Sequence, residues 1–155
     1  MANAVNDPLS IARALCMVFE GVYLRPYMCP AGVPTIGIGT TRYETGLRVT
    51  LTDPPITRQR AEDLLMWELR TKCLPQVMRL CATLESWGPH SVAAIVDFTY
   101  NLGSGNLQSS TLRRRILEND RQGARLELMR WVRGGGKVLP GLVKRRQAEA
   151  ALIVD

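Results

Sequence analysis

The sequence predicts an α+β fold in which a small antiparallel β lobe lies beside a larger helical lobe. Three patterns support this prediction: apolar residues at helical spacing over 8–19, a stretch rich in Gly, Pro and Thr over 21–56, and helical patterns over most of 57–155. The 155 residues are 46% hydrophobic and 22% charged, which suits one globular domain. We therefore expect a single domain over 1–155, with a β lobe at roughly 21–56, a helical lobe at roughly 57–155 plus the N-terminal helix, and a cleft between them.

The N-terminal helix and the segment after it are predicted by their end signals. Asp7 is a candidate N-cap, Pro8 suits the first helical position, and apolar residues then recur at helical spacing to Phe19. After Gly21 the pattern changes, because Ile and Gly alternate over 36–39 and the stretch closes on Asp-Pro-Pro at 53–55. These features are typical of a small antiparallel sheet with loops.

Helical patterns return at Thr57, a candidate N-cap, and reach about residue 80 with Pro75 as a break or kink. Residues 92–102 are apolar on nearly all sides, which predicts a buried central helix that ends at Gly103. Shorter amphipathic helices are expected near 110–118, 121–133 and 140–153.

The net charge of +6 favours an anionic partner, which could be nucleic acid, a membrane surface or a bacterial envelope. Basic residues cluster at 113–115 and 144–146, where we expect solvated helix faces. Four cysteines without a CxxC pair and a single histidine argue against a zinc cluster. We expect reduced thiols and synthesis in a cytoplasm, and we read the N-terminus as neither a signal peptide nor a membrane span.

Glu20 ends an apolar helix just before the predicted sheet. A carboxyl group there is partly desolvated, which favours the protonated form that a general acid needs. Position alone is explained more simply by an ordinary helix-terminal Glu in solvent. The spacing adds information, because Cys29 follows after eight intervening residues and Thr35 after five more.

The pattern Glu20, Cys29, Thr35 resembles the catalytic signature of phage-type lysozymes, glycoside hydrolase family 24. Three later motifs are similar to that family in the same order: DFTYNLG at 97–103, SSTL at 109–112 and PGLVKRRQAE at 140–149. The resemblance implies a two-lobed lysozyme fold and cleavage of the β-1,4 bond between N-acetylmuramic acid and N-acetylglucosamine. It calls for no metal or cofactor.

In the mechanism that the resemblance implies, Glu20 donates a proton to the glycosidic oxygen. Cys29, at a position where many members have Asp, would activate or hold the attacking water, and Thr35 would orient it. An inverting enzyme needs about 6.5 to 9.5 Å between its two groups to admit this water. A free thiol has a pKa of about 8.5, so Cys29 would be mostly neutral unless its surroundings lower that value. Covalent attack by sulfur stays open.

The family motifs also suggest substrate contacts. Asn101, Ser110 and Thr111 carry short polar groups that can bond a sugar, although capping explains Ser110 and Asn101 as well. Arg145 could reach the acidic groups of the cleft and help to set their charge, or it could lie solvated at the surface. The resemblance further implies bacterial peptidoglycan as the partner, release by a phage holin and a location in the host cytoplasm before lysis. We expect a monomer, no nucleic-acid partner and no stable membrane insertion.

Three other functions fit parts of the sequence. A lytic transglycosylase cuts the same bond with one acid but has no need of Cys29 and Thr35. A thiol peptidase using Cys29 with His90 lacks a recognisable nucleophile setting. A basic module that binds nucleic acid or the envelope would explain the charge but not the spacing of the motif.

Overall fold

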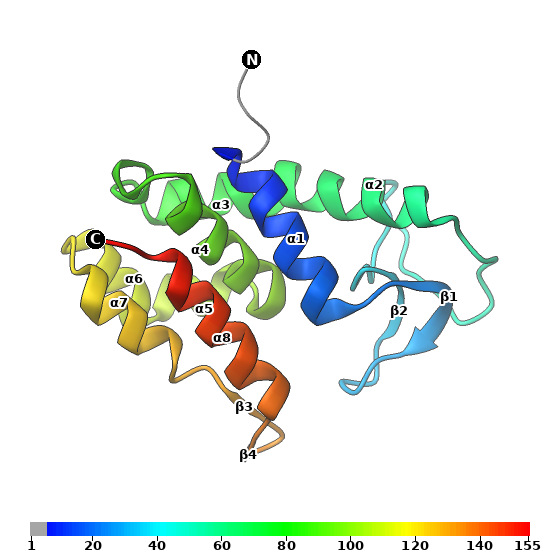
Figure 1. Ribbon diagram of the computed structural model, residues 1–155. Helices are drawn as coiled ribbons and strands as arrows, with labels where there is room; N and C mark the ends of the chain where they lie inside the picture. The colour runs from blue at the N-terminus through cyan, green and yellow to red at the C-terminus, as the bar shows by residue number, and fades with distance from the viewer. Residues whose placement is uncertain (1–5) are drawn as a thin grey trace.

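The computed structural model describes residues 6–155 (Figure 1). Its main elements are α1 (Pro8–Glu20), β1 (Tyr23–Met28), β2 (Pro34–Gly37), α2 (Arg58–Glu68), α3 (Leu74–Leu80), α4 (Pro89–Leu102), α5 (Ser104–Ser109), α6 (Thr111–Leu117), α7 (Arg121–Leu128), β3 (Arg133–Gly134), β4 (Lys137–Val138) and α8 (Pro140–Leu152). The small antiparallel strands and the larger set of helices confirm the predicted α+β class. Within 6–155, no helix combines the length and the apolar character needed to cross a bilayer. The expectation about the very start of the chain falls on residues 1–5, outside the described residues.

Helix α1 begins and ends where its sequence signals predict. The Asp7 side chain accepts a hydrogen bond from the Ser10 backbone N–H at 2.9 Å, and Pro8 occupies the first turn. Gly21 ends the helix with a φ of 72°, which glycine adopts without steric cost. Glu20 is therefore the last helical residue, at the point where the chain enters the sheet.

Strands β1 and β2 form the predicted antiparallel pair, with Tyr27 opposite Thr35 and Met28 opposite Pro34. The turn between them closes where the Gly32 N–H donates to the Cys29 carbonyl at 2.8 Å. Two isolated bridges, at 36–40 and 42–48, extend this β region. The strands are short, so most of the segment is loop.

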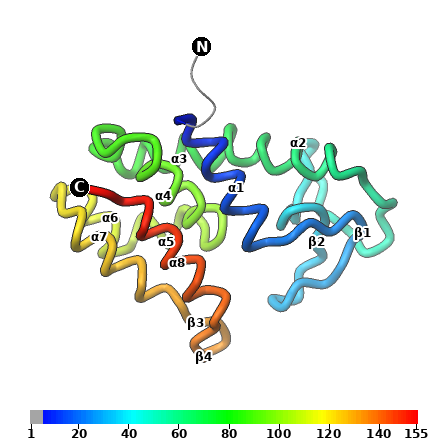
Figure 2. Tube along the Cα trace, in the orientation of Figure 1, coloured from blue at the N-terminus to red at the C-terminus, as the bar shows by residue number. Residues whose placement is uncertain are grey.

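The helix predicted from Thr57 is broken, although the break lies before Pro75. Helices α2 and α3 are joined by a π-helical turn over Leu69–Cys73, in which the Leu74 N–H donates to the Leu69 carbonyl five residues earlier. Proline has no N–H to continue an α-helical ladder, and a π turn is a common way to absorb such an interruption. Figure 2 shows α2 and α3 nearly in line along one side of the molecule.

Helix α4 is the buried centre of the helical lobe, as predicted. Every residue from Ser91 to Thr99 is buried, and Gly103 ends the helix with a φ of 88°. Helices α1 and α8, from the two ends of the chain, both pack against α4 (Figure 1). The first and last helices thus share one packing partner, the central helix α4.

Two expectations for the C-terminal half are wrong. The helix predicted over 121–133 ends at Leu128, and residues 133–138 form the small β3–β4 hairpin instead. Gly135 and Gly136, with φ of 57° and 80°, form its turn in a left-handed conformation that favours glycine. Helix α5 was not predicted, because its sequence SGNLQS has only one buried apolar side chain, Leu107, and therefore no apolar period.

The expectation of reduced thiols is confirmed. All four cysteines are free thiols. Trp87 is buried, and Trp131 packs edge-to-face on Phe98 with ring centroids 5.4 Å apart. Trp67 is only half-buried and lies under Lys72, whose ammonium is 4.9 Å from its ring.

Candidate active site

Glu20 lies at the junction of the two lobes, with its side chain 23% exposed. Its Oε1 accepts a hydrogen bond from Nη1 of Arg145 at 2.6 Å. A Cβ atom built at Gly39 would be 3.1 Å from Glu20 Oε2 and would crowd this carboxyl group, and the φ of 77° also favours glycine there. Tyr100 of α4 donates to the Ile38 carbonyl beside it, which fixes the Gly39 segment to the helical lobe. Glu20 thus meets both lobes.

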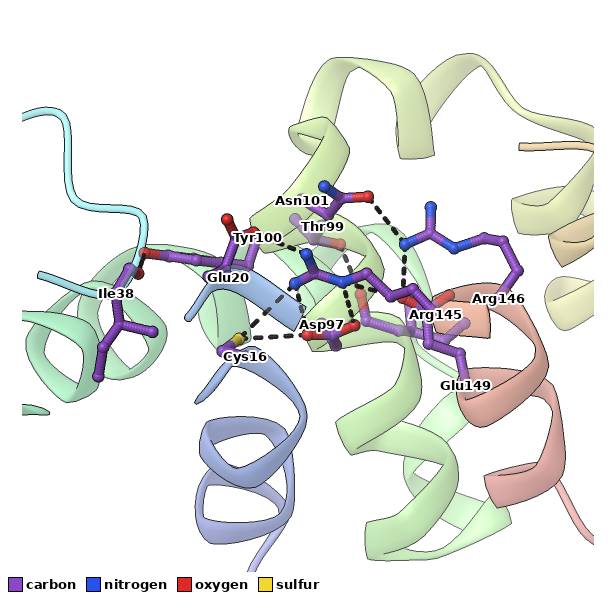
Figure 3. Close-up of polar contacts among 11 residues, drawn as sticks. Cys16, Glu20, Ile38, Asp97, Thr99, Tyr100, Asn101, Arg145, Arg146 and Glu149 are labelled. Carbon is purple, nitrogen blue, oxygen red and sulfur yellow. Dashed lines mark hydrogen bonds and ion pairs between the residues drawn. The ribbon is translucent and has the colours of Figure 1, made fainter. Parts of the chain in front are cut away.

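Arg145 is buried, with 3% of its side chain exposed, and it holds a second carboxylate (Figure 3). Its Nε donates to Asp97 Oδ2 at 2.9 Å and its Nη2 donates to Oδ1 at 2.8 Å. Burial disfavours a charged guanidinium, but the hydrogen bonds and charges of Asp97 and Glu20 more than offset this and raise the pKa of Arg145. Arg145 is therefore a permanent cation between two carboxyl groups.

The second arginine of α8 is also buried. Nη2 of Arg146 donates to Asn101 Oδ1 at 2.9 Å and to Glu149 Oε1 at 2.7 Å (Figure 3). The expected solvated face at 144–146 is therefore wrong for Arg145 and Arg146, and only Lys144 is exposed. Helix α8 turns these two basic side chains into the core because buried carboxyl groups compensate their charge.

The carboxyl groups around these arginines differ in protonation. Burial opposes ionisation of Asp97, yet its hydrogen bonds with Arg145 outweigh this and lower the pKa of Asp97. Burial, followed by a hydrogen bond with Asp97, raises the pKa of Glu149 well above its ordinary value. These opposite shifts mean that Asp97 ionises more readily than Glu149, so the negative charge of the buried cluster is held first at Asp97.

Cys29 and Thr35 lie close together at the turn of the β1–β2 hairpin. Thr35 is opposite Tyr27 near the end of β1, and Cys29 begins the turn, where the Thr35 hydroxyl and the Glu20 charge both act on its thiol. Thr35 is 3% exposed and its hydroxyl donates to the Val33 carbonyl at 2.9 Å. A hydrogen bond from the Val33 backbone, assisted by the Thr35 hydroxyl, lowers the pKa of Cys29 despite partial burial. The thiol is thus more acidic than a free cysteine, without a cation or helix end.

Ser110 and Thr111 are not part of the Glu20 network in the described chain. Ser110 is the N-cap of α6, since its hydroxyl accepts from the Arg113 N–H at 3.0 Å. Both residues line two neighbouring surface pockets of about 360 and 350 Å³. Asn101 contacts Arg146 instead of either of them. The substrate roles of these residues and of Arg145 stay predictions.

Several residues of the site were missed at the level of sequence: Cys16, Gly39, Asp97, Tyr100 and Glu149. One signal was available, because Asp97 is the one charged residue in the sequence of α4. A carboxyl group on a helix that is apolar all round needs a buried cation, although the sequence offers two basic runs, at 113–115 and 144–146, as its source. No cluster of three or more metal-ligating side chains occurs in the part of the chain that the structure describes.

Comparison with known proteins agrees with this geometry. The family model described as "Phage lysozyme" matches residues 17–149. An endolysin of Acyrthosiphon pisum secondary endosymbiont phage 1 is 34% identical over 140 residues, covering 86% of this chain and 88% of that protein. A SAR-endolysin of bacteriophage PS119 is 31% identical over 135 residues, covering 84% of this chain and 73% of that protein. The solved endolysin from Escherichia coli O157:H7 phage FAHEc1 superposes with a TM-score of 0.82 at 30% identity, covering 94% of this chain and 91% of that one.

Proposed function

Because this chain belongs to the phage lysozyme family, we propose that it is an endolysin that hydrolyses the β-1,4 bond between N-acetylmuramic acid and N-acetylglucosamine of bacterial peptidoglycan, with Glu20 as the proton donor. The family makes the chain a glycoside hydrolase of the lysozyme type. The observation that carries the assignment of Glu20 is its position at the lobe junction, with Arg145 on one carboxyl oxygen and Gly39 beside the other.

The acid step follows from the two different oxygens of Glu20. Oε1 is occupied by Arg145, so the proton is carried on Oε2, which faces the β region. This proton passes to the glycosidic oxygen as the bond from that oxygen to the anomeric carbon breaks, and positive charge develops on the sugar ring. The leaving sugar departs with its hydroxyl group restored.

The water step is assigned to the turn of the β1–β2 hairpin. Cys29 and Thr35 would hold one water opposite the leaving group, and the lowered pKa of Cys29 favours a thiolate that can accept the proton of that water. Attack from the face opposite the leaving group inverts the anomeric carbon. The thiol then takes the place of the second carboxylate of an inverting pair.

Sugar contacts are proposed for Asn101, Ser110 and Thr111. The Asn101 carbonyl oxygen is engaged by Arg146, so its amide N–H groups are the donors it can offer to an acetamido group. The pockets beside Ser110 and Thr111 support a second place where the glycan strand can rest.

Replacement of the proton donor tests the proposal. Glu20→Gln keeps the shape of the side chain but cannot donate the proton, so we expect lysis of purified peptidoglycan to vanish while circular dichroism stays unchanged. Glu62→Gln, which alters another half-buried, ion-paired carboxylate, is the matched control and should lyse normally. Reducing sugar ends among the wild-type products identify hydrolysis, whereas anhydro ends identify cyclisation. A folded Glu20→Gln protein that lyses at the wild-type rate refutes the assignment.

We also propose that the protein acts as a monomer from the host cytoplasm and that a phage holin releases it to the wall. The endolysin relatives support this proposal, and the net charge of +6 suits an anionic wall. Expression with and without a holin, together with light scattering on the purified chain, tests both parts.

A further inference from the structure

Asp97 is a fully buried carboxylate beside the site, and its hydrogen bonds converge on the partner of Glu20. It is 0% exposed and accepts two bonds from Arg145. The Cys16 thiol donates a further bond to Asp97 Oδ1 at 3.2 Å. A buried charge of this kind needs a partner that offsets the cost of its desolvation. Here the partner is Arg145, which also contacts the proposed acid, Glu20.

The geometry of Arg145 makes Asp97 a positioning device. A guanidinium group is planar and rigid, so a carboxylate that binds two of its nitrogens fixes the direction of the third. Asp97 binds Nε and Nη2, and the remaining Nη1 points at Glu20 Oε1 at 2.6 Å. Without Asp97, the guanidinium plane of Arg145 would be free to rotate, and Nη1 would no longer be directed at Glu20.

Helix α1 contributes two residues to the same hydrogen-bond network. Cys16 lies four residues before Glu20, and residues at this spacing share one face of a helix. Since Cys16 contacts Asp97 and Glu20 contacts Arg145, the last turn of α1 is held at two points against α4 and α8 (Figure 3). The network therefore fixes the end of the helix as well as the carboxyl group.

The charge of Asp97 matters as much as its geometry. Nη1 of Arg145 places a positive charge 2.6 Å from Oε1 of the proposed proton donor. Asp97 places an opposing negative charge on the same guanidinium group. We propose that Asp97 is a positioning residue that, through Arg145, orients Glu20 and balances the positive charge beside it, an inference that rests on the proposed role of Glu20.

The titratable and charged groups around Glu20 come from every packed element: Cys16 on α1, Tyr27 and Cys29 on the hairpin, Asp97 and Tyr100 on α4, and Arg145, with Arg146 and Glu149 behind it, on α8. Of these, Asp97 is the ionised carboxylate that shares Arg145 with Glu20. Its removal leaves the full positive charge of Arg145 directed at Glu20.

The test is the pH dependence of lysis of purified peptidoglycan by Asp97→Asn. The fall in rate at the alkaline side of the pH–rate profile, its alkaline limb, reports loss of the donated proton. We expect this limb to move to lower pH by about one unit, so that activity is about tenfold lower at pH values just above it. Thr99→Val, a buried polar change on the same helix without contact to Arg145, should lower the melting temperature but leave the limb in place. A folded Asp97→Asn protein with an unmoved limb overturns the inference.

A double variant keeps the test decisive if Asp97→Asn does not fold. Asp97→Asn combined with Arg145→Gln leaves neither charge of the pair, and its limb should match that of Arg145→Gln alone, because Asp97 acts through Arg145. A difference between these two limbs contradicts the inference. Wild-type protein must lyse and Glu20→Gln must not, so failure of the proposed function is seen separately.

Discussion

Arg145 joins two carboxylates that have different tasks. Asp97 is buried and ionised, whereas Glu20 is 23% exposed at the junction of the lobes and is the proposed proton donor. One guanidinium group can serve both because its three nitrogens diverge in one plane. At the scale of the residue, Glu20 and Asp97 therefore share the single positive charge of Arg145.

Cys29 is the residue whose role can be separated most clearly by substitution. Cys29→Asp should keep substantial activity, because a carboxylate also accepts a proton and holds water, and its acid limb should move to lower pH because Asp has an ordinary pKa near 3.9. Cys29→Ala should lose about 100-fold, since a methyl group does neither. Rates of peptidoglycan lysis across pH measure both effects.

The control is Met28→Ala, the neighbouring exposed residue at the end of β1, which should retain activity. NMR of the products from a defined oligosaccharide reports stereochemistry, and we expect inversion. Retention, or a sugar adduct on Cys29 by intact mass, would replace the water mechanism with attack by sulfur.

Short helices carry much of the architecture around the pockets, and their ends depend on single side chains. Helix α6 has seven residues and begins at Ser110, whose hydroxyl accepts from the Arg113 N–H and donates to the Leu107 carbonyl. This one hydroxyl thus joins α5 to α6. Such a helix has few internal hydrogen bonds, so its cap contributes a large share of its stability.

Ser110→Ala tests whether this residue is only a cap. Loss of an N-cap should destabilise the fold by about 1 kcal/mol, measured by urea unfolding. Thr57→Ala removes the equivalent cap of α2 and is the matched control for stability. We expect slower lysis for Ser110→Ala and not for Thr57→Ala, because Ser110 lines the pockets and Thr57 does not. Equal rates in the two variants would exclude a substrate contact.

The whole molecule places its first and last helices against one central helix. Because α1 supplies Glu20, α4 supplies Asp97 and α8 supplies Arg145, the site forms only when the two ends of the chain are both docked. The network is therefore complete only when α1, α4 and α8 are packed together. The buried charges also connect the stability of the whole fold to pH.

Glu149→Gln should reveal that connection. The pKa of Glu149 is raised by burial and by its hydrogen bond with Asp97. A carboxyl group with a raised folded-state pKa stabilises the fold fully below its unfolded pKa, near 4.3, and loses this contribution as pH rises through the folded value. The Gln variant has no such loss, so its melting temperature should gain on wild type between pH 4 and pH 8.

Calorimetry over that range measures the difference. Glu118→Gln, an exposed position at the end of α6, is the control and should follow the wild-type curve. A constant offset between Glu149→Gln and wild type at every pH would mean that the pKa of Glu149 is the same in the folded and unfolded chain.

Local patterns were sufficient for much of this protein. The caps at Asp7 and Thr57, the apolar run of α4 and the spacing of Glu20, Cys29 and Thr35 depend on residues close in sequence, so the sequence alone determined the fold class, most helices and the family. Where local signals were weak, in α5 and in the Gly-rich β3–β4 turn, prediction failed.

The charge network was decided only by the tertiary structure. Asp97 and Arg145 lie 48 positions apart, and Arg145 and Glu20 lie 125 apart. No periodicity indicates that an arginine in a basic run turns inward, because the free energy of burying it depends on carboxylates supplied by other helices. The sequence therefore determined which helices form, and their packing decided which charges meet.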